Sequence, residues 1–492
     1  MSNIECLNEY VSTGNLPQQD AFIKKSTVLG QVRKFQTRAY NGIAYFRSSN
    51  RSKIRFNLKL SMKKFVFFVL GSLTMLGLQA QGNEPYEFKE YKRYAATPIK
   101  SQDQTGTCWA FSTASFLESE ALRLGKGETD LSEMFIVRHI YRMKCENYVR
   151  RQGTAQFGEG GLAHDMLNAV ARFGIVPQSV YQGRQDLDKP FNHASLEKAL
   201  KEKCDEFVEQ GKKGKLDPSW LEQIDVILDA EFGPAPTKFS YNHSVFSPQS
   251  YRDFLGINPE DYVSITSFTH HPFWGKFTLE VPDNWSNGEF YNLPLDDMMR
   301  CATYAIEKGY TLDWDTDNSN MGFSRSSGLA IVPKTPWQEK SASARANSFK
   351  NWEPELKISQ EYRQQLFDRQ ETTDDHLMHI IGVLDEKHSG IYFIVKNSWG
   401  EISPLKGYVY ASEAYLRLNT LSFTLPKMAL PVDIKRRLGL EQGQVNIEQK
   451  EEKELKPVKP AKISNESRRK PTESKDTLKP QPIKRPVDGG NN

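Results

Sequence analysis

The chain has 492 residues, of which 38% are hydrophobic, 11% aromatic and 26% charged, with a formal net charge of +4. This composition is that of a globular protein, and it excludes a collagenous chain, a disulfide-dense mini-protein and a wholly disordered protein. Residues 1–81 carry +9, residues 441–492 carry +3, and the body between them carries −8. An acidic body is not what a nucleic-acid-binding domain presents, because such a domain gathers Lys and Arg on one folded surface.

The first predicted element is a secretory signal peptide at residues 62–81. Two lysines follow Met62, 14 largely apolar residues follow them, and the small Ala80 comes next. This order is typical of such a signal, and the apolar run is too short to span a bilayer core of about 30 Å comfortably. Since these signals act at a free N-terminus, we predict that translation starts at Met62 and that residues 1–61 are not translated. We expect cleavage near Ala80, no stable membrane span afterwards, and export to the periplasm or the extracellular space.

The next element is a helix that begins at Cys108. Apolar residues recur behind the cysteine at spacings of four and three up to Leu124, which predicts one buried stripe, and Gly125 and Gly127 follow as stop signals. A cysteine in the first helical turn lies at the positive end of the helix dipole, where the thiol pKa falls. Gln102 offers a side-chain amide as a hydrogen-bond donor. These features favour a nucleophilic Cys108 over an inert, buried thiol.

The other cysteines of the body are Cys145, Cys204 and Cys301. Their spacing is that of neither a metal site nor a disulfide framework, so we expect them to be small buried hydrophobic residues. The Lys- and Glu-rich stretch 194–216 predicts the solvated face of a helix rather than a binding patch.

Two predicted strands near the end of the body carry further polar residues. His376 and His379 lie in an apolar run that alternates like a strand, so their side chains point to opposite faces. A turn at 386–390 leads into a second apolar strand, 391–395, after which Asn397 follows. A neutral amide there can accept a hydrogen bond from an imidazole N–H and fix its orientation without adding charge.

From residue 441 the composition turns to Lys, Glu, Pro, Ser and Gln, with scarcely any aromatic residues. Such a segment cannot bury enough apolar surface to offset the entropy of ordering it, which predicts a disordered tail over 441–492. The alternative is a polybasic arm for an acidic partner, but the charges are interleaved rather than clustered.

Five blocks of the sequence, in the family's order, resemble those of papain-like cysteine peptidases. They are QDQTGTCWAFS (102–112), LSE (131–133), GEGG (158–161), DHLMHIIG (375–382) and VKNSWG (395–400). The resemblance covers both halves of roughly 90–425. It implies an α+β, papain-like fold, with a mainly helical half that carries the nucleophile and an antiparallel, β-barrel-like half that carries the histidine and the asparagine.

The resemblance assigns a role to each of four residues. Cys108 is the expected nucleophile, and the Gln102 amide with the Cys108 backbone N–H would bind the developing oxyanion. The family's histidine stands six residues before a glycine, as His376 does, so His376 is the expected base and His379 a structural residue. Asn397 would orient the imidazole.

The remaining blocks imply the surroundings of the site. Gly160 and Gly161 would hold the substrate main chain, Trp399 would cover the contact between the imidazole and the amide, and Ser132 is an expected N-cap. Peptides are the expected substrates, and neither a metal nor an organic cofactor is expected.

The spacing of the blocks resembles one branch of the family. Cys108 and His376 lie 268 positions apart, about twice the separation in a compact papain-like enzyme, so an insertion at roughly 185–355 is predicted, as in the bleomycin hydrolase and aminopeptidase C branch. That likeness implies an aminopeptidase acting through an acyl-enzyme, possible homo-oligomers, and a chain end that recognises the substrate α-amine from within the cleft. The long tail of this chain departs from that pattern. The alternatives are an endopeptidase with an open cleft and, further off, a non-catalytic peptide- or nucleic-acid-binding protein.

Overall fold

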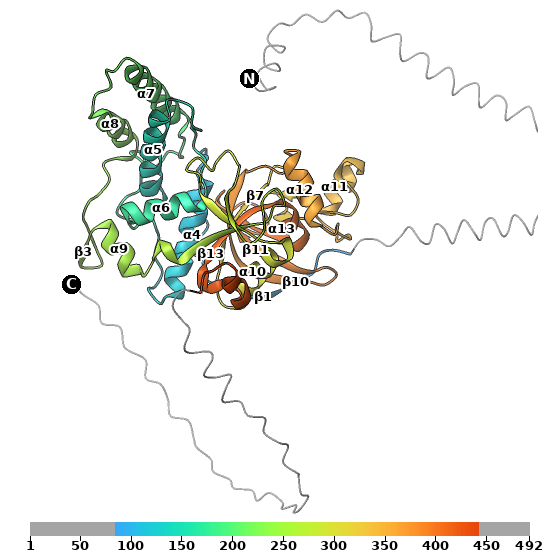
Figure 1. The fold of residues 1–492 in the computed structure, drawn as a ribbon. Coiled ribbons are helices and arrows are strands. Elements are labelled where there is room, and N and C mark those ends of the chain that lie inside the picture. The colour runs from blue at the N-terminus through green and yellow to red at the C-terminus, as the bar shows by residue number, and fades with distance from the viewer. Residues whose placement is uncertain (1–83, 442–492) are drawn as a thin grey trace, which may run out of the picture. The chain divides into compact units, whose positions relative to one another are not determined.

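The computed structural model describes residues 84–441, which Figure 1 shows as a coloured ribbon. The predicted signal peptide at 62–81 and the stretch 1–61 lie outside the described residues, as does nearly all of the predicted tail. Export, the start at Met62 and the disordered tail therefore stay predictions. Within 84–441, no helix is both long enough and apolar enough to cross a membrane.

Helices dominate the first part of the described chain and share one hydrophobic core. Their bounds are α4 (Cys108–Arg123), α5 (Glu133–Arg150), α6 (Ala163–Phe173), α7 (Ala194–Lys212), α8 (Trp220–Phe232) and α9 (Pro248–Leu255). The Phe135 N–H donates to Ser132 Oγ at 3.1 Å, which confirms the predicted N-cap of α5. In α7 the Lys and Glu side chains lie exposed or half-exposed over a buried apolar stripe, which confirms the predicted solvated face.

Strands dominate the second part, and most of them join one 11-stranded sheet in the order β5-β6-β4-β13-β7-β10-β11-β12-β9-β8, with β1 paired to β10. Their bounds are β1 (Phe88–Arg93), β4 (Tyr262–Thr266), β5 (Lys276–Thr278), β6 (Glu289–Asn292), β7 (Leu312–Thr316), β8 (Phe323–Ser324), β9 (Leu329–Ala330), β10 (His376–Glu386), β11 (Gly390–Lys396), β12 (Tyr408–Ser412) and β13 (Thr420–Pro426). A separate hairpin pairs β2 (Phe239–Tyr241) with β3 (Ser244–Phe246).

Further short helices accompany the sheet and, in part, close a second hydrophobic core against it. They are α10 (Leu295–Glu307), α11 (Ala342–Ser348), α12 (Gln360–Asp368), α13 (Glu413–Asn419) and α14 (Val432–Arg437), with 3-10 turns η1 (Pro259–Asp261), η2 (Trp337–Glu339) and η3 (Lys427–Ala429).

The stretch predicted as an insertion, roughly 185–355, contributes to both parts of the fold. It contains α7 to α11 and β2 to β9, and β4 to β9 belong to the same sheet as β10 and β11. Within that sheet β7 pairs directly with β10, and Thr316 lies opposite His376. The stretch therefore supplies part of the framework that positions His376.

The helix predicted to begin at Cys108 is α4, and Gly125 and Gly127 after it adopt positive φ angles of 73° and 81°. These backbone angles are ones that glycine adopts at little cost. The prediction of a single buried stripe is wrong, because every residue from Cys108 to Ala121 is buried. Figure 1 shows the reason: α4 runs between the other helices and the sheet.

The polar side of α4 finds its partners on the sheet. The hydroxyls of Ser112 and Thr113 both donate to the carboxylate of Asp313 on β7, the second at 2.5 Å. Because a buried hydroxyl needs a hydrogen-bond partner, these contacts allow a helix with polar residues to be buried all round. They also fix the nucleophile helix to the half of the fold that carries His376.

The hairpin of β10 and β11 agrees with the sequence. β10 ends at Glu386 and β11 begins at Gly390, so the predicted turn at 386–390 and the strand that follows it are confirmed. Cys145, Cys204 and Cys301 are free and fully buried, which confirms their prediction as small core residues.

Candidate active site

Cys108 is the first residue of α4 and is only 8% exposed. The first N–H groups of a helix have no intrahelical partner and lie at the positive end of its dipole, so the Cys108 N–H is a donor available to an anion. The backbone N–H of Leu377 on β10 is close enough to the Cys108 thiol to favour its charged form. Since Leu377 follows His376, the structure brings the predicted nucleophile next to the strand end that carries the predicted base.

His376 and Asn397 form the central contact of the site. His376 Nε2 lies 2.8 Å from Asn397 Oδ1, and both residues are buried. The Ser398 N–H donates to the same Oδ1 at 2.7 Å, which holds the amide oxygen toward the imidazole. From this network we assign the proton to Nε2, so that Nδ1 is the nitrogen left to act as a base. The Trp399 ring stacks on the imidazole, with centroids 4.6 Å apart.

Burial disfavours the Cys108 thiolate and the His376 imidazolium when each charge forms without the other. Burial raises the pKa of Cys108 to about 12. Three nearby carboxyl groups add to this rise, those of Asp283, Asp374 and Asp315. Burial also lowers the pKa of His376 to about 4. The expected fall of the thiol pKa is therefore not found, because desolvation and the nearby carboxyl groups outweigh the helix dipole.

Burial therefore favours the neutral form of each group when the two are considered separately. When the proton passes from sulfur to Nδ1, two opposite charges appear together, and their attraction in a buried site offsets much of the cost of each.

Gln102, the predicted oxyanion donor, is buried in the segment that leads to Cys108. Its amide nitrogen donates to the Thr105 carbonyl at 2.7 Å, and its amide oxygen accepts from the Ser398 hydroxyl at 2.7 Å. A side-chain amide nitrogen carries two N–H donors, so one remains for a substrate oxygen. The bond to Ser398 also ties the Cys108 segment to the segment of Asn397.

His379 has a different environment. Its Nδ1 lies 2.9 Å from the hydroxyl of Ser115 on α4, and the Lys396 ammonium donates to the same hydroxyl at 2.7 Å. Burial, with a smaller contribution from Lys396, lowers the pKa of His379 well below its ordinary value. The structure therefore pairs His376, and not His379, with Asn397.

Gly160 and Gly161 lie where larger residues would not fit. A Cβ at Gly160 would overlap the Asp283 carboxylate, and one at Gly161 would come within 3.2 Å of the Trp109 ring. The Gly160 carbonyl accepts a hydrogen bond from the Lys144 ammonium. The Gly160 carbonyl was one of the main-chain groups predicted to bind the substrate, and it already accepts this hydrogen bond from within the protein.

Two carboxyl groups of the cleft were missed by sequence reasoning, those of Asp283 and Asp374. Asp283 lies in the stretch assigned to the insertion, where no motif marks it. Asp374 could have been noticed, because it stands two residues before His376 in an acidic pair.

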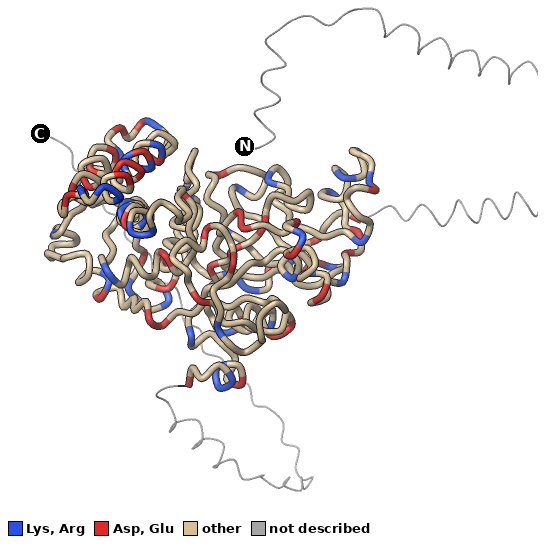
Figure 2. Tube along the Cα trace, turned by 45° about the horizontal axis from the view of Figure 1, so that its top comes forward, with Lys and Arg blue, Asp and Glu red and all other residues tan. Residues whose placement is uncertain are grey.

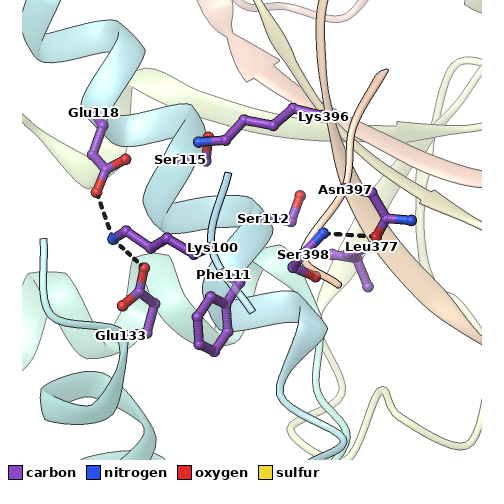
Figure 3. Close-up of a pocket in the computed structure, with 10 residues that line it drawn as sticks. All are labelled: Lys100, Phe111, Ser112, Ser115, Glu118, Glu133, Leu377, Lys396, Asn397 and Ser398. Atoms are coloured by element: carbon purple, nitrogen blue, oxygen red, sulfur yellow. Dashed lines mark hydrogen bonds and ion pairs between the residues drawn. The ribbon is translucent and has the colours of Figure 1, made fainter. Parts of the chain in front are cut away.

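Behind the site a small pocket is lined by charged residues from both halves of the fold (Figure 3). The Lys100 ammonium lies 3.2 Å from Glu118 on α4 and 2.6 Å from Glu133 on α5. Glu118, 1% exposed, also accepts from the Thr97 hydroxyl and from the Leu131 N–H. This buried network fastens the irregular segment before Gln102 to two helices, and so supports the site from behind.

Replacing Glu118 with alanine should lower the free energy of unfolding by about 1–3 kcal/mol, because the change leaves the Thr97 hydroxyl and the Leu131 N–H without their acceptor. The Lys100 ammonium keeps its pairs with Glu133 and Asp130. Urea denaturation of the two proteins measures the difference. The matched control is Glu307→Ala, which breaks the half-exposed pair between Lys92 and Glu307 and should change stability little. Equal stability of the Glu118 variant and the wild type would contradict the role given to this network.

Within residues 84–441, one group of side chains has the spacing of metal ligands, that of His270, His271 and Glu280. The Nε2 atoms of the two imidazoles lie 3.1 and 2.7 Å from the Glu280 carboxylate. These hydrogen bonds account for the grouping.

The sequence and the fold of this chain are similar to those of known peptidases. A model of the Peptidase C1-like family matches residues 148–448, which include His376 and Asn397. Aminopeptidase C of Lactococcus lactis subsp. lactis strain IL1403 is 22% identical over 388 residues, covering 71% of this chain and 85% of that protein. Aminopeptidase G of Lactobacillus delbrueckii subsp. lactis is 20% identical over 382 residues, covering 68% and 82%. The structure of PepW from Lactobacillus rhamnosis HN001 covers 80% of this chain and 96% of that one, with a TM-score of 0.57 and 17% identity.

The molecule is thus a cysteine-type peptidase with the predicted α+β, papain-like fold. The chain belongs to the Peptidase C1-like family, in the branch of aminopeptidase C and bleomycin hydrolase, and this confirms the resemblance found in its sequence.

Proposed function

We propose that this protein is an aminopeptidase that releases N-terminal residues from peptides through Cys108, His376 and Asn397. The observation that carries the proposal is the 2.8 Å contact between His376 and Asn397 beside a cysteine that begins a buried helix. A nucleophile, a base and a group that orients the base are the parts that acyl transfer requires.

The first half of the reaction forms an acyl-enzyme. The Cys108 sulfur attacks the scissile carbonyl as its proton passes to His376 Nδ1. The carbonyl oxygen gains negative charge, which the Cys108 N–H and the remaining N–H of Gln102 stabilise. His376 then gives its proton to the leaving amine, and the C–N bond breaks.

The second half releases the acyl group. The neutral His376 takes a proton from a water molecule, and the hydroxide attacks the thioester carbonyl. Collapse of this intermediate expels the Cys108 sulfur, which regains its proton from the imidazolium. Asn397, a positioning residue, keeps the imidazole in one orientation through both halves, and Trp399 shields their contact.

Two observations bear on the choice of function. The curated relatives that match most of this chain carry the names aminopeptidase C and aminopeptidase G. The alternative of a nucleic-acid-binding protein finds little support, because Lys and Arg are intermingled with Asp and Glu along the described chain (Figure 2) and the body has a charge of −8.

Paired fluorogenic substrates test this function. Each pair carries the same residue with a free or an acetylated N-terminus, and purified protein is assayed under reducing conditions. We expect hydrolysis of the free-amine member alone. Efficient hydrolysis of the acetylated member would contradict an aminopeptidase and indicate an endopeptidase with an open cleft.

A further inference from the structure

One carboxylate from outside the sequence blocks of the site lies against the glycine strip, which is residues 158–161. The Asp283 side chain lies against Gly160, so closely that a Cβ on that glycine would overlap both of its oxygens. The Asp283 backbone N–H donates to Asp374 Oδ2 at 3.3 Å, and Asp374 stands two residues before His376. Asp283 therefore connects the glycine strip of the helical half with the strand end of the other half.

This position is next to the nucleophile. Gly106, two residues before Cys108, donates its N–H to Glu159 Oε2 at 2.5 Å, and a Cβ on Gly106 would lie 3.7 Å from the Gly160 nitrogen. The segment of Cys108 and the glycine strip are therefore in contact. The Asp283 carboxylate lies against Gly160 of that strip, and close enough for its charge to raise the pKa of the Cys108 thiol.

The segment that carries Asp283 is held firmly. The Asn284 amide donates to the carbonyls of Leu279 and Gly288 at 2.8 and 3.0 Å, which closes a loop on itself. The Ser286 hydroxyl donates to Asp165 Oδ1 on α6 at 2.6 Å, and the Trp285 side chain is buried. Asp283 thus has a fixed place in the cleft, which a recognition group requires.

The carboxylate has no cation bound to it among residues 84–441. Asp283 forms no salt bridge there, and its recorded hydrogen bond is that of its backbone. The ammonium of the neighbouring Lys144 donates hydrogen bonds to the carbonyls of Gly158 and Gly160 instead. Deeper in the same acidic group, Asp315 Oδ1 is fully buried and has no hydrogen-bond partner. A half-buried carboxylate is costly unless a cation pairs with it.

We propose that the Asp283 carboxylate binds the α-ammonium group of the substrate's first residue and blocks the cleft to any chain extending beyond it. This inference rests on the proposed peptidase function. A peptide's α-ammonium offers a positive charge and three N–H donors, and Asp283 supplies the complementary acceptor beside the nucleophile. The same charge would relieve the carboxylates that disfavour the Cys108 thiolate, so a correct substrate helps to activate its own nucleophile.

The test compares Asp283→Asn, Asp283→Glu and wild type on the free and acetylated substrate pairs. In Asp283→Asn we expect kcat/KM for free-amine substrates to fall by about 10- to 100-fold, the range for losing one charge-assisted hydrogen bond. The acetylated substrates should be cleaved as well as before or better, so the ratio between the two classes collapses. Asp283→Glu, which keeps the charge, should keep most of the preference.

The matched control is Asp385→Asn, which removes an exposed carboxylate from β10 and should leave both rates unchanged. Thermal unfolding of each variant separates a loss of recognition from a loss of fold. If the wild type prefers free amines and Asp283→Asn keeps that preference undiminished, the role of Asp283 is overturned and the aminopeptidase stands. If the wild type hydrolyses neither class, it is the proposed function that fails.

Discussion

Replacing Cys108 with alanine should lower kcat/KM for peptide hydrolysis by at least about 10⁴-fold, because the variant cannot form the acyl-enzyme. The fold should survive, since the side chain is small and alanine suits a helix start flanked by the intact α4 core. Steady-state assays on the free-amine substrates measure the effect. Loss of activity together with an unchanged thermal unfolding curve is the expected result.

A control from the same residue type sharpens this experiment. Cys301→Ala removes a sulfur from the core of α10 and should keep near-normal activity. Iodoacetamide offers a second readout, because Cys108 is the most accessible of the four cysteines in the described residues, the others being fully buried. Mass spectrometry should find the label on Cys108 in the inactivated wild type. Equal activity in Cys108→Ala and wild type would remove the basis of the proposed mechanism.

Replacing His376 with alanine should lower kcat by about 10³- to 10⁴-fold, because the imidazole that Asn397 orients is then missing and cannot take the sulfur proton and return it to the leaving amine. The contact with Asn397 at 2.8 Å would be lost with it. Single-turnover assays would show the loss in the formation of the acyl-enzyme. Added imidazole, which can enter the space left by the side chain, should restore part of the rate.

His379 provides the matched comparison, as it stands three residues away on the same strand. His379→Gln removes a buried imidazole bonded to Ser115, so it should lower the free energy of unfolding by about 1–3 kcal/mol. The pH profile of kcat should keep its shape. If His379→Gln instead removed the activity from a folded protein while His376→Ala retained it, the two roles would have to be exchanged.

Local features of the chain were readable from the sequence alone. The start of α4 at Cys108, its glycine stop, the Ser132 cap and the turn at 386–390 each follow from neighbouring residues. Hydrophobic spacing, capping side chains and glycine angles act over a few positions, so one sequence suffices to see them. The pairing of His376 with Asn397 was also foreseen, because these residues stand in distinctive blocks.

The predictions for the two chain ends also depend on local sequence alone. The charged, apolar and small residues of 62–81, from which we propose export, and the composition of 441–492 are properties of short stretches.

Only the tertiary structure decided the environment of these residues. The burial of α4 on every side depends on Asp313, which lies 201 positions from Ser112. The direction of the Cys108 pKa depends on desolvation and on carboxyl groups from distant segments, and these outweigh the local helix dipole. The placement of Asp283 on Gly160 joins residues that no motif connects. Solvent exclusion and the electrostatic field at a residue depend on all the groups that folding brings near it. Most of these groups are distant in the sequence, so local sequence patterns do not predict their combined effect.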